Sequence, residues 1–162
     1  MRIDQAGYRF NVGIIMVNDD QRVFLAKRIG HDAWQFPQGG VNANETAKQA
    51  LFRELKEEIG LDPEDVDVLA STRHWLKYQL PKQYWRLDAR PLVIGQKQRW
   101  FLLKMRCNER KVRLDLSESP EFDSWRWVDY WEPISHVIYF KQQVYRQALK
   151  ELAPFLKGKP PC

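Results

Sequence analysis

Three glutamates with helical spacing are the residues best placed to do chemistry. Glu54, Glu57 and Glu58 stand at i, i+3 and i+4, so at about 100° per residue their side chains share one face of a helix. Carboxylate oxygens are the hard ligands that Mg²⁺ takes, often together with the phosphate oxygens of a substrate, and Mn²⁺ accepts the same ligands. The spacing therefore predicts a divalent-metal site with room for more than one ion.

A solvated charged face is the competing interpretation, because most acidic helix faces are no more than that. Like charges at i, i+4 cost roughly 0.2–0.5 kcal/mol, and Glu54 and Glu58 form such a pair. Arg53 can reach Glu57 and offset part of this cost, so the energy alone decides little. The glycine-rich segment 39–40, which leads into the helix, favours the metal-site interpretation.

A helix over about 44–59 would present these acids. Asn42 with Glu45 three residues later has the character of a capping box, and Asn44 is an equally good cap. Gly60 suits the left-handed residue that ends a helix, and Pro63 prevents continuation. The remaining positions divide into a core-facing stripe of Leu51, Phe52, Leu55 and Ile59 and a solvent-facing set of Gln49, Arg53 and Lys56.

The flanking segments predict a mixed sheet between helices, an α+β arrangement. Short β-type runs and turn residues predict a hairpin of strands 11–17 and 22–27, a loop at 34–40, strands at 66–72, 92–94, 100–106 and 124–128, and a loop with room for one short strand across 75–90. An amphipathic helix is expected over 135–152. Its inward residues would be Val137, Tyr145, Ala148, Leu149 and Leu152.

Length and composition exclude several classes of protein. The 162 residues are 44% hydrophobic and 29% charged, which suits one folded domain over 1–156 with a short tail at 157–162. No run approaches the ~18 apolar residues that cross a bilayer, and the N-terminus lacks a secretory signal. Cys107 and Cys162 form no disulfide framework or cysteine zinc site. We expect a cytoplasmic monomer that does not bind membranes.

The net charge of +5 is unevenly distributed. Segment 73–113 holds twelve Lys or Arg against two acids, whereas 54–67 holds seven acids against one Lys. A basic field suits a phosphate chain or RNA, and aromatic residues interleaved with cations suit single-stranded RNA. Those aromatics equally fit the core of a sheet; they are Trp75, Tyr78, Tyr84, Trp85, Trp100 and Phe101.

The acidic face lies within a longer pattern. Gly39, five residues, Glu45, seven residues and then the segment 53–61 (RELKEEIGL) resemble the complete Nudix box, with nine constrained positions filled over twenty-three residues. The resemblance implies the Nudix α/β/α sandwich and Mg²⁺-dependent hydrolysis of a diphosphate bond in a nucleoside diphosphate derivative. A non-catalytic module that keeps the scaffold would be expected to have broken box positions, and none is broken here.

The resemblance also implies roles for the box residues. Glu54, Glu57 and Glu58 would be metal ligands, one of them also serving as the base that activates water, and which one stays open. The structural members of the box would be Gly39, Glu45, Arg53 and Gly60.

Outside the box, segments such as WQFPQGG, GQKQRWFLL and PEFDSWRWVDYW resemble a bacterial branch of the Nudix family. Its members convert 5′-triphosphorylated or diphosphorylated RNA ends to monophosphates and so promote RNA decay. The likeness runs from about residue 3 to 152. The alternative substrate class is a dinucleoside polyphosphate such as Ap4A or Ap5A. Some relatives are stimulated by a protein partner, and no residue of this chain predicts one.

This second resemblance implies further site residues. Glu121 would be another metal ligand, or else a plain loop acid beside proline. Arg28 and Phe140 would sandwich the base of the second nucleotide, with Arg9 and Lys141 close by, although Phe140 also fits core packing. Additional phosphate or RNA contacts would come from Arg73, Lys77, Lys82, Gln96 and Lys97.

Overall fold

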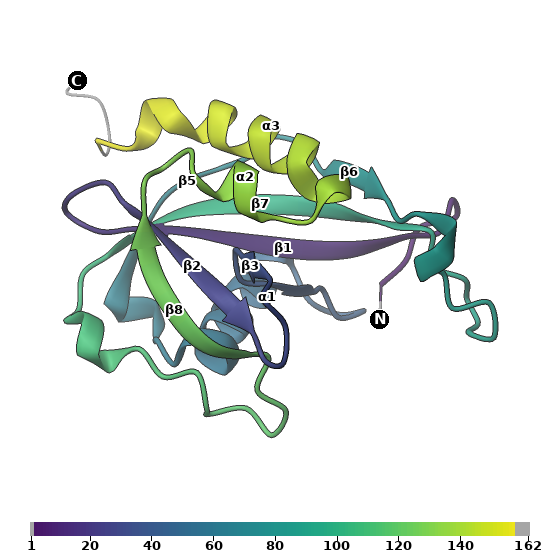
Figure 1. Cartoon of the computed structure of the whole chain (residues 1–162), viewed down its shortest axis with the longest axis horizontal. Coiled ribbons are helices and arrows are strands. Elements are labelled where there is room, and N and C mark those ends of the chain that lie inside the picture. Colours follow the sequence, from purple (N-terminus) through teal and green to yellow (C-terminus); the bar gives the residue numbers. More distant parts are fainter. Residues whose placement is uncertain (1, 158–162) are drawn as a thin grey trace.

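An eight-stranded mixed sheet with helices on both faces forms the body of the computed structural model, which describes residues 2–157 (Figure 1). The main strand order is β3-β2-β1-β7-β5, with β4 paired to β1, β6 to β7 and β8 to β2. The strands are β1 (Tyr8–Val17), β2 (Val23–Arg28), β3 (Trp34–Gln35), β4 (Gln38–Gly40), β5 (Val66–Ser71), β6 (Leu76–Gln79), β7 (Gly95–Met105) and β8 (Phe122–Val128). The helices are α1 (Ala47–Glu54), which continues as a π-helical turn (Leu55–Ile59), α2 (Pro133–His136) and α3 (Gln142–Leu152).

The centre of the sheet is the parallel pair β1 and β7. Their register runs without interruption from Tyr8 opposite Gly95 to Val17 opposite Lys104. Both strands carry nearly continuous apolar sequence in their second halves, as expected for strands covered on both faces. The predicted mixed sheet is therefore confirmed, because all the other strand pairs are antiparallel.

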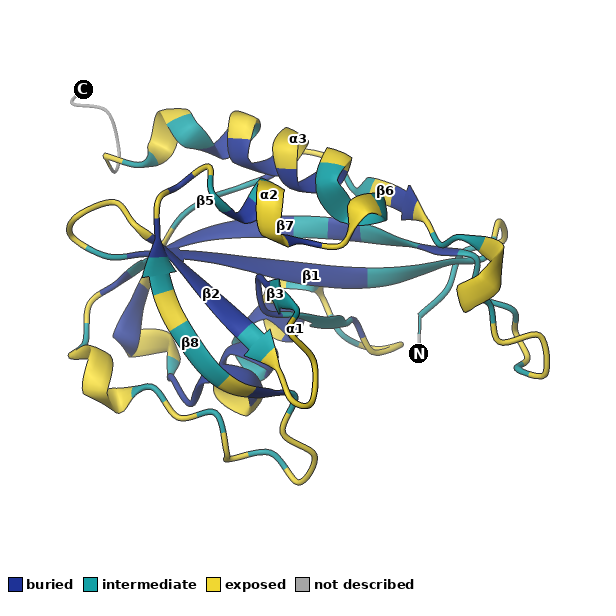
Figure 2. Ribbon diagram, viewed as in Figure 1, coloured by how far each residue is buried: buried dark blue, intermediate teal, exposed yellow. Residues whose placement is uncertain are grey.

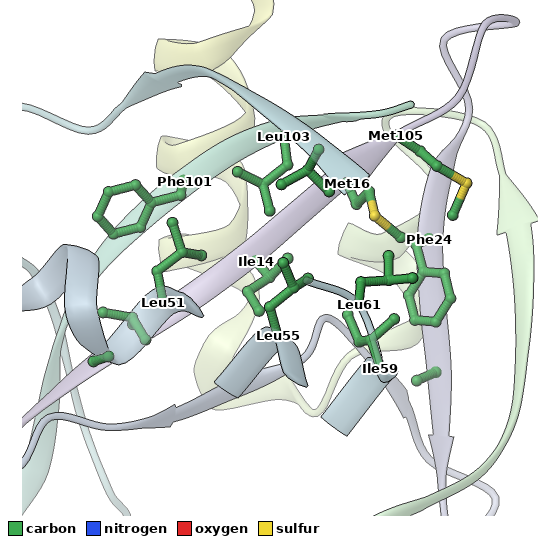
Figure 3. Close-up of a cluster of buried hydrophobic side chains, with 14 of the residues drawn as sticks. Ile14, Met16, Phe24, Leu51, Leu55, Ile59, Leu61, Phe101, Leu103 and Met105 are labelled. Carbon is green, nitrogen blue, oxygen red and sulfur yellow. The ribbon is translucent and has the colours of Figure 1, made fainter. Parts of the chain in front are cut away.

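Two cores lie on opposite faces of this sheet. On one face, Ile14, Leu103 and Phe101 pack against the apolar stripe of α1, with Leu51 and Leu55 fully buried (Figure 3). On the other face, α3 turns its buried side toward the sheet and its exposed side outward (Figure 2). The predicted α/β/α sandwich is confirmed, and so are the inward residues of the last helix, all of which are buried: Val137, Tyr145, Ala148, Leu149 and Leu152.

The predicted hairpin forms, but its strands separate soon after the turn. β1 and β2 pair at Val17 and Val23, and beyond that point β2 takes β8 and β3 as partners while β1 takes β7 and β4. The sheet therefore consists of two groups of strands that join at one end. The group of β1, β4 and β7 lines the cavity described below, and Glu121 reaches it from the segment just before β8.

Several predicted boundaries are wrong. The segment 34–40 is not simply a loop, because β4 pairs with Asn11–Gly13 and β3 with β2. No strand forms at 92–94, where the chain enters β7 only at Gly95. The last helix is broken, because Val137 and Ile138 are extended (ψ 154° and 142°), as suits two adjacent β-branched residues. The short strand expected within 75–90 is β6.

No helix among residues 2–157 is long and apolar enough to cross a membrane. Apart from Lys157, the predicted tail lies outside the described residues.

Candidate active site

The three glutamates come together as their spacing predicts. Carboxylate oxygens of Glu54, Glu57 and Glu58 all lie within 4.8 Å of one another. Glu54 and Glu58 are buried, whereas Glu57 is exposed. Glu54 ends α1, and the other two stand on the π-helical turn, which closes when the Gly60 amide donates to the carbonyls of Leu55 (3.1 Å) and Lys56 (3.0 Å). Gly60 has the expected left-handed conformation, with φ 81°.

The helix begins later than predicted. Thr46 is the N-cap: its hydroxyl accepts from the Gln49 amide (3.1 Å), and the Gln49 side chain accepts from the Thr46 amide (2.9 Å). This capping box replaces the ones predicted at Asn42 and Asn44. Glu45 does accept from the Asn42 amide (2.9 Å), but its main partner is an arginine on the helix.

Arg53 ties the parts of the site together instead of facing solvent as predicted. Its guanidinium donates twice to Glu45 (2.8 and 2.9 Å) and to the Gly40 carbonyl (2.7 Å). It also donates to Glu54 (2.8 Å) and Glu57 (3.3 Å). Its bonds to Glu45 hold the pKa of that carboxyl below its ordinary value despite burial. The arginine thus joins the end of β4, the start of α1 and two of the acids.

Glycines at the end of β4 give the charged groups room. A Cβ at Gly39 would lie 2.0 Å from the Glu54 carboxyl carbon, and one at Gly40 would lie 2.2 Å from the Arg9 guanidinium. Both contacts are far inside van der Waals separation, so only glycine allows these side chains to rest against the strand. This explains in atomic terms why the motif requires Gly39.

The acids line one side of a cavity of about 310 Å³. Glu121 faces it from the segment just before β8, where its carbonyl accepts from the Ile29 amide (3.0 Å). The other lining residues are uncharged apart from one arginine. Together the lining residues are Arg9, Asn11, Gln38, Gly39, Gly40, Glu54, Glu58, Gln96 and Glu121.

Burial and mutual repulsion disfavour ionisation of these acids. Burial raises the pKa of Glu54 to about 7, against the opposing effect of Arg53. Burial, and then the charges of Glu121 and Glu54, raise the pKa of Glu58 to about 8. Burial also raises the pKa of Glu121. A divalent cation among these oxygens would remove the repulsion, so the donor set fits a hard divalent metal ion.

Two further cavities follow the acidic one, the first sharing residues with it and the second sharing residues with the first. Arg9 and Gln96 also line a cavity of about 380 Å³ bordered by Tyr84, Arg86 and Arg90. Tyr84 in turn borders a cavity of about 200 Å³. This last cavity contains three residues that the sequence placed at a base-binding site, namely Arg28, Phe140 and Lys141.

The charge of Lys141 links the third cavity to Glu121, and ring contacts hold Phe140 in that cavity. Burial and the nearby Arg28 charge lower the pKa of Lys141 to about 8, although Glu121 opposes this effect. Phe140 is half-buried, with its ring centroid 5.8 Å from that of Tyr78 and 5.4 Å from that of Tyr84. Phe140 thus both packs on the sheet and lines the cavity.

The other predicted contacts lie elsewhere. Side chains alternate along a strand, so Lys97 is on the sheet face opposite Gln96, where it pairs with Asp4 and lies 5.6 Å from the Phe10 ring centre. Lys77 is its partner across β6 and β7. Arg73 and Lys82 are exposed. Of the interleaved aromatics, three are core residues, which are Tyr78, Trp100 and Phe101.

Sequence reasoning missed three polar residues of the cavity region. Asn11, Gln38 and Gln98 form a buried hydrogen-bonded group beside the acids. A signal existed for two of them, because Asn11 interrupts an apolar strand and Gln98 repeats Gln96 at the strand period of two. Only the pairing of β1 with β7 and β4 shows that they meet.

Comparisons with known proteins agree with this geometry. The NUDIX domain model matches residues 7–152. An RNA pyrophosphohydrolase of Legionella pneumophila (strain Corby) is 69% identical over 97% of this chain and 90% of its own length. One of Pseudomonas fluorescens (strain SBW25) is 59% identical over 97% and 99%. Among solved structures, the dihydroneopterin triphosphate pyrophosphohydrolase of E. coli is similar with a TM-score of 0.68 and 22% identity, covering 89% of this chain and 98% of its own. A C. elegans Ap4A hydrolase has a TM-score of 0.66 and 21% identity, covering 92% and 98%.

Proposed function

The chain belongs to the Nudix family, and on that premise we propose that it is an RNA 5′ pyrophosphohydrolase. It would convert triphosphorylated or diphosphorylated 5′ ends to monophosphates, which promotes RNA decay. The observation that carries this proposal is the 59–69% identity to RNA pyrophosphohydrolases along 97% of the chain. The two solved structures named above are too distant in sequence to bear on the substrate.

The metal ligands in this proposal are Glu54, Glu57, Glu58 and Glu121. Their oxygens are hard donors gathered around one cavity, which suits Mg²⁺ or Mn²⁺ and more than one ion during turnover. When bound, such ions neutralise charge on the phosphoryl oxygens and lower the pKa of an attacking water.

The chain's own residues hold this site in place. Arg53 positions Glu54 and Glu57 through its hydrogen bonds, and Gly39 leaves the space that the Glu54 carboxyl occupies. One of the three box glutamates would take the proton from the attacking water. Arg9, which lines the same cavity as the acids, supplies positive charge for the phosphate chain.

The cavity beside Glu121 suits a nucleobase. Arg28, Phe140 and Lys141 line it together, and a base stacks favourably on an aromatic ring and on a planar guanidinium. Arg9 and Gln96 border both the acidic cavity and the arginine-lined one, where the RNA backbone would leave the site. Lys77 and Lys97 would contact RNA on the other face of the sheet. The proposed RNA contacts of Arg73 and Lys82 rest on the resemblance alone.

A competition assay tests the substrate. The protein with Mg²⁺ would be mixed with equal concentrations of a short 5′-triphosphorylated RNA and Ap5A, and the consumption of both would be followed over time. Because both substrates compete for one site, the ratio of their rates gives the ratio of kcat/KM. We expect faster conversion of the RNA to its monophosphate, with release of pyrophosphate.

The controls separate the outcomes of this assay. Glu58→Gln and excess EDTA should each abolish both reactions. Preferential loss of Ap5A would replace the RNA proposal by a dinucleoside polyphosphate hydrolase, and turnover of neither substrate by the wild type would contradict both.

The remaining expectations are a single domain, a monomer and a cytoplasmic location. Sedimentation equilibrium tests whether the protein is a monomer, and fractionation of cells tests whether it is cytoplasmic.

A further inference from the structure

The polar wall of the acidic cavity contains buried side-chain atoms that lack a hydrogen-bond partner. It is built from one face of β1, β4 and β7 and presents Arg9, Asn11, Gln38 and Gln96, with Gln98 behind them. Five buried side-chain atoms in the described chain lack a hydrogen-bond partner, and three of them belong here: Arg9 Nε, Gln96 Oε1 and Gln98 Oε1. Unpartnered buried polar groups cost about 1–3 kcal/mol each. Of these three only Arg9 Nε is a donor, and Arg9 lines the cavity, so this atom points to a ligand with acceptor oxygens.

Gln98 fixes the direction of two carboxamides in this wall. Its Nε2 group donates to Asn11 Oδ1 (2.9 Å) and to Gln38 Oε1 (3.2 Å). The strand pairing makes this contact rigid, since Gln98 and Asn11 are direct partners across β1 and β7 and are 1% and 2% exposed. With both oxygens engaged by Gln98, Asn11 keeps its N–H groups for other partners, whereas the Gln38 side chain also hydrogen-bonds the Tyr78 hydroxyl.

The direction of these amides decides what the wall can bind. A carboxamide offers N–H donors at one end and an acceptor oxygen at the other. If Gln98 pointed its oxygen at Asn11, the Asn11 amide would turn its own oxygen outward and add an acceptor beside the glutamates. With Gln98 donating, the wall offers neutral donors, which bind phosphate oxygens and do not form ion pairs with the glutamates opposite.

We propose that Gln98 is a positioning residue for phosphate binding, which orients the Asn11 amide donor toward the oxygens of the substrate's phosphate chain and holds Gln38 against Asn11 and Tyr78. The inference rests on the proposed function in that a phosphate chain occupies the cavity. The acids would then hold the metal ions bound to that chain, and the Asn11 amide with Arg9 would bind its phosphate oxygens.

Three variants test this role. Gln98→Glu keeps the size of the side chain but can only accept, so it reverses the Asn11 amide. Gln98→Met has similar length and no hydrogen bond, so it releases that amide. Asn11→Asp leaves Gln98 intact and removes one donor. The matched control for added charge is Gln79→Glu, because Gln79 is exposed on β6 and lies outside the cavity lining.

Calorimetric binding of inorganic pyrophosphate in Mg²⁺ is the first readout, and KM and kcat on triphosphorylated RNA are the second. We expect Gln98→Glu to weaken pyrophosphate binding 10–100-fold, as is usual for residues that orient ligating groups, and Gln98→Met to weaken it less. Asn11→Asp should resemble Gln98→Glu, and Gln79→Glu should equal the wild type. Loss through KM more than kcat would identify a binding contribution.

The melting temperature separates positioning from folding. A purely structural role predicts that the loss of binding follows the loss of Tm and is as large in Gln98→Met as in Gln98→Glu. If Gln98→Glu does not fold, Asn11→Asp still carries the test. Pyrophosphate binding within twofold of the wild type in a folded Gln98→Glu or Asn11→Asp would overturn the inference while leaving RNA hydrolysis intact. Wild-type protein that binds pyrophosphate with this dependence but hydrolyses no RNA would overturn the proposed function alone.

Discussion

Two acidic groups that are neighbours in the sequence have opposite environments in the fold. The first is the cluster of Glu54, Glu57 and Glu58, and the second is the pair of Asp62 and Asp65 just beyond Gly60. Both groups include buried carboxylates. They differ in what the surrounding chain provides to neutralise them.

The aspartate pair is neutralised from within. Lys111 donates to Asp65 (2.6 Å) and Asp62 (3.4 Å), and Lys56 pairs with Asp62 (3.2 Å). Burial opposes ionisation of Asp65, but its bonds from Lys111 and from the Asp62 amide (2.8 Å) outweigh this and hold its pKa below the ordinary value. These acids stabilise the turn after the helix.

The glutamate cluster is left short of positive charge. Arg53 contacts Glu54 and Glu57, and no described residue pairs with Glu58. Burial, to which the neighbouring carboxylates add, raises the pKa of Glu54 to about 7 and that of Glu58 to about 8, and the one arginine at Glu54 does not offset it. The contrast teaches that the chain supplies cations to the aspartates of the turn and leaves Glu58 without one, which supports the proposal that an external cation binds the glutamates.

Removing Glu58 should give the largest effect on activity. Glu58→Gln is expected to lower kcat by at least about 10²–10³-fold, the scale for losing one electrostatic group of an active site. Steady-state hydrolysis of triphosphorylated RNA measures this. The fold should persist, because the variant removes a carboxylate that is costly to bury. Activity within tenfold of the wild type would exclude Glu58 from the site.

Displacing Glu54 without changing it should give the second-largest effect. Gly39→Ala places a methyl group where the Glu54 carboxyl lies, and a misplacement of about 1 Å can cost roughly 10²-fold in rate. The same assay applies, with Glu54→Gln for comparison. Wild-type activity in the Gly39→Ala variant would show that the carboxyl can move without loss.

The two acidic groups should respond to pH with opposite signs. The folded pKa of Glu58, about 8, exceeds its ordinary value of 4.5, so the folded state binds the proton more tightly and loses stability as pH rises between these values. The lowered pKa of Asp65 instead supplies stability above its ordinary value of 3.8, which is lost on acidification.

Thermal melting in EDTA measures the first of these responses. The wild-type Tm should fall from pH 5 to pH 8 more than that of Glu58→Gln, and Mg²⁺ should restore it at pH 8 by binding the folded state. Parallel Tm curves for the two proteins would contradict the predicted charge deficit.

Breaking the neutralised pair should give the smallest effect, and only on stability. Asp65→Asn keeps an acceptor oxygen but removes the carboxylate charge that pairs with Lys111, and it should cost roughly 1 kcal/mol, or about 2–4 °C in Tm for a chain of this size. The value of kcat should stay within twofold of the wild type. A large fall in kcat would mean that the two acidic groups are not independent.

Local sequence predicts much of the candidate site. Residues three and four apart share a helix face, so the spacing of Glu54, Glu57 and Glu58 brings their carboxylates together. Gly60 ends the helix because glycine adopts φ 81° without steric cost. The helix start was misplaced because three closely spaced candidate caps, at Asn42, Asn44 and Thr46, satisfy the same local rule. Only the path of the chain from β4 selects Thr46.

The sequence by itself determined the acids, their spacing and the two apolar faces of the sandwich, since these follow from helix and strand periodicity. Only the tertiary structure decided that Arg53 turns inward to Glu45 and Gly40 and that Gln98 meets Asn11 and Gln38. These contacts join residues from different elements, and they depend on strand register and on close approach at glycines. Periodicity describes one segment at a time, so it cannot specify which side chains meet across the sheet.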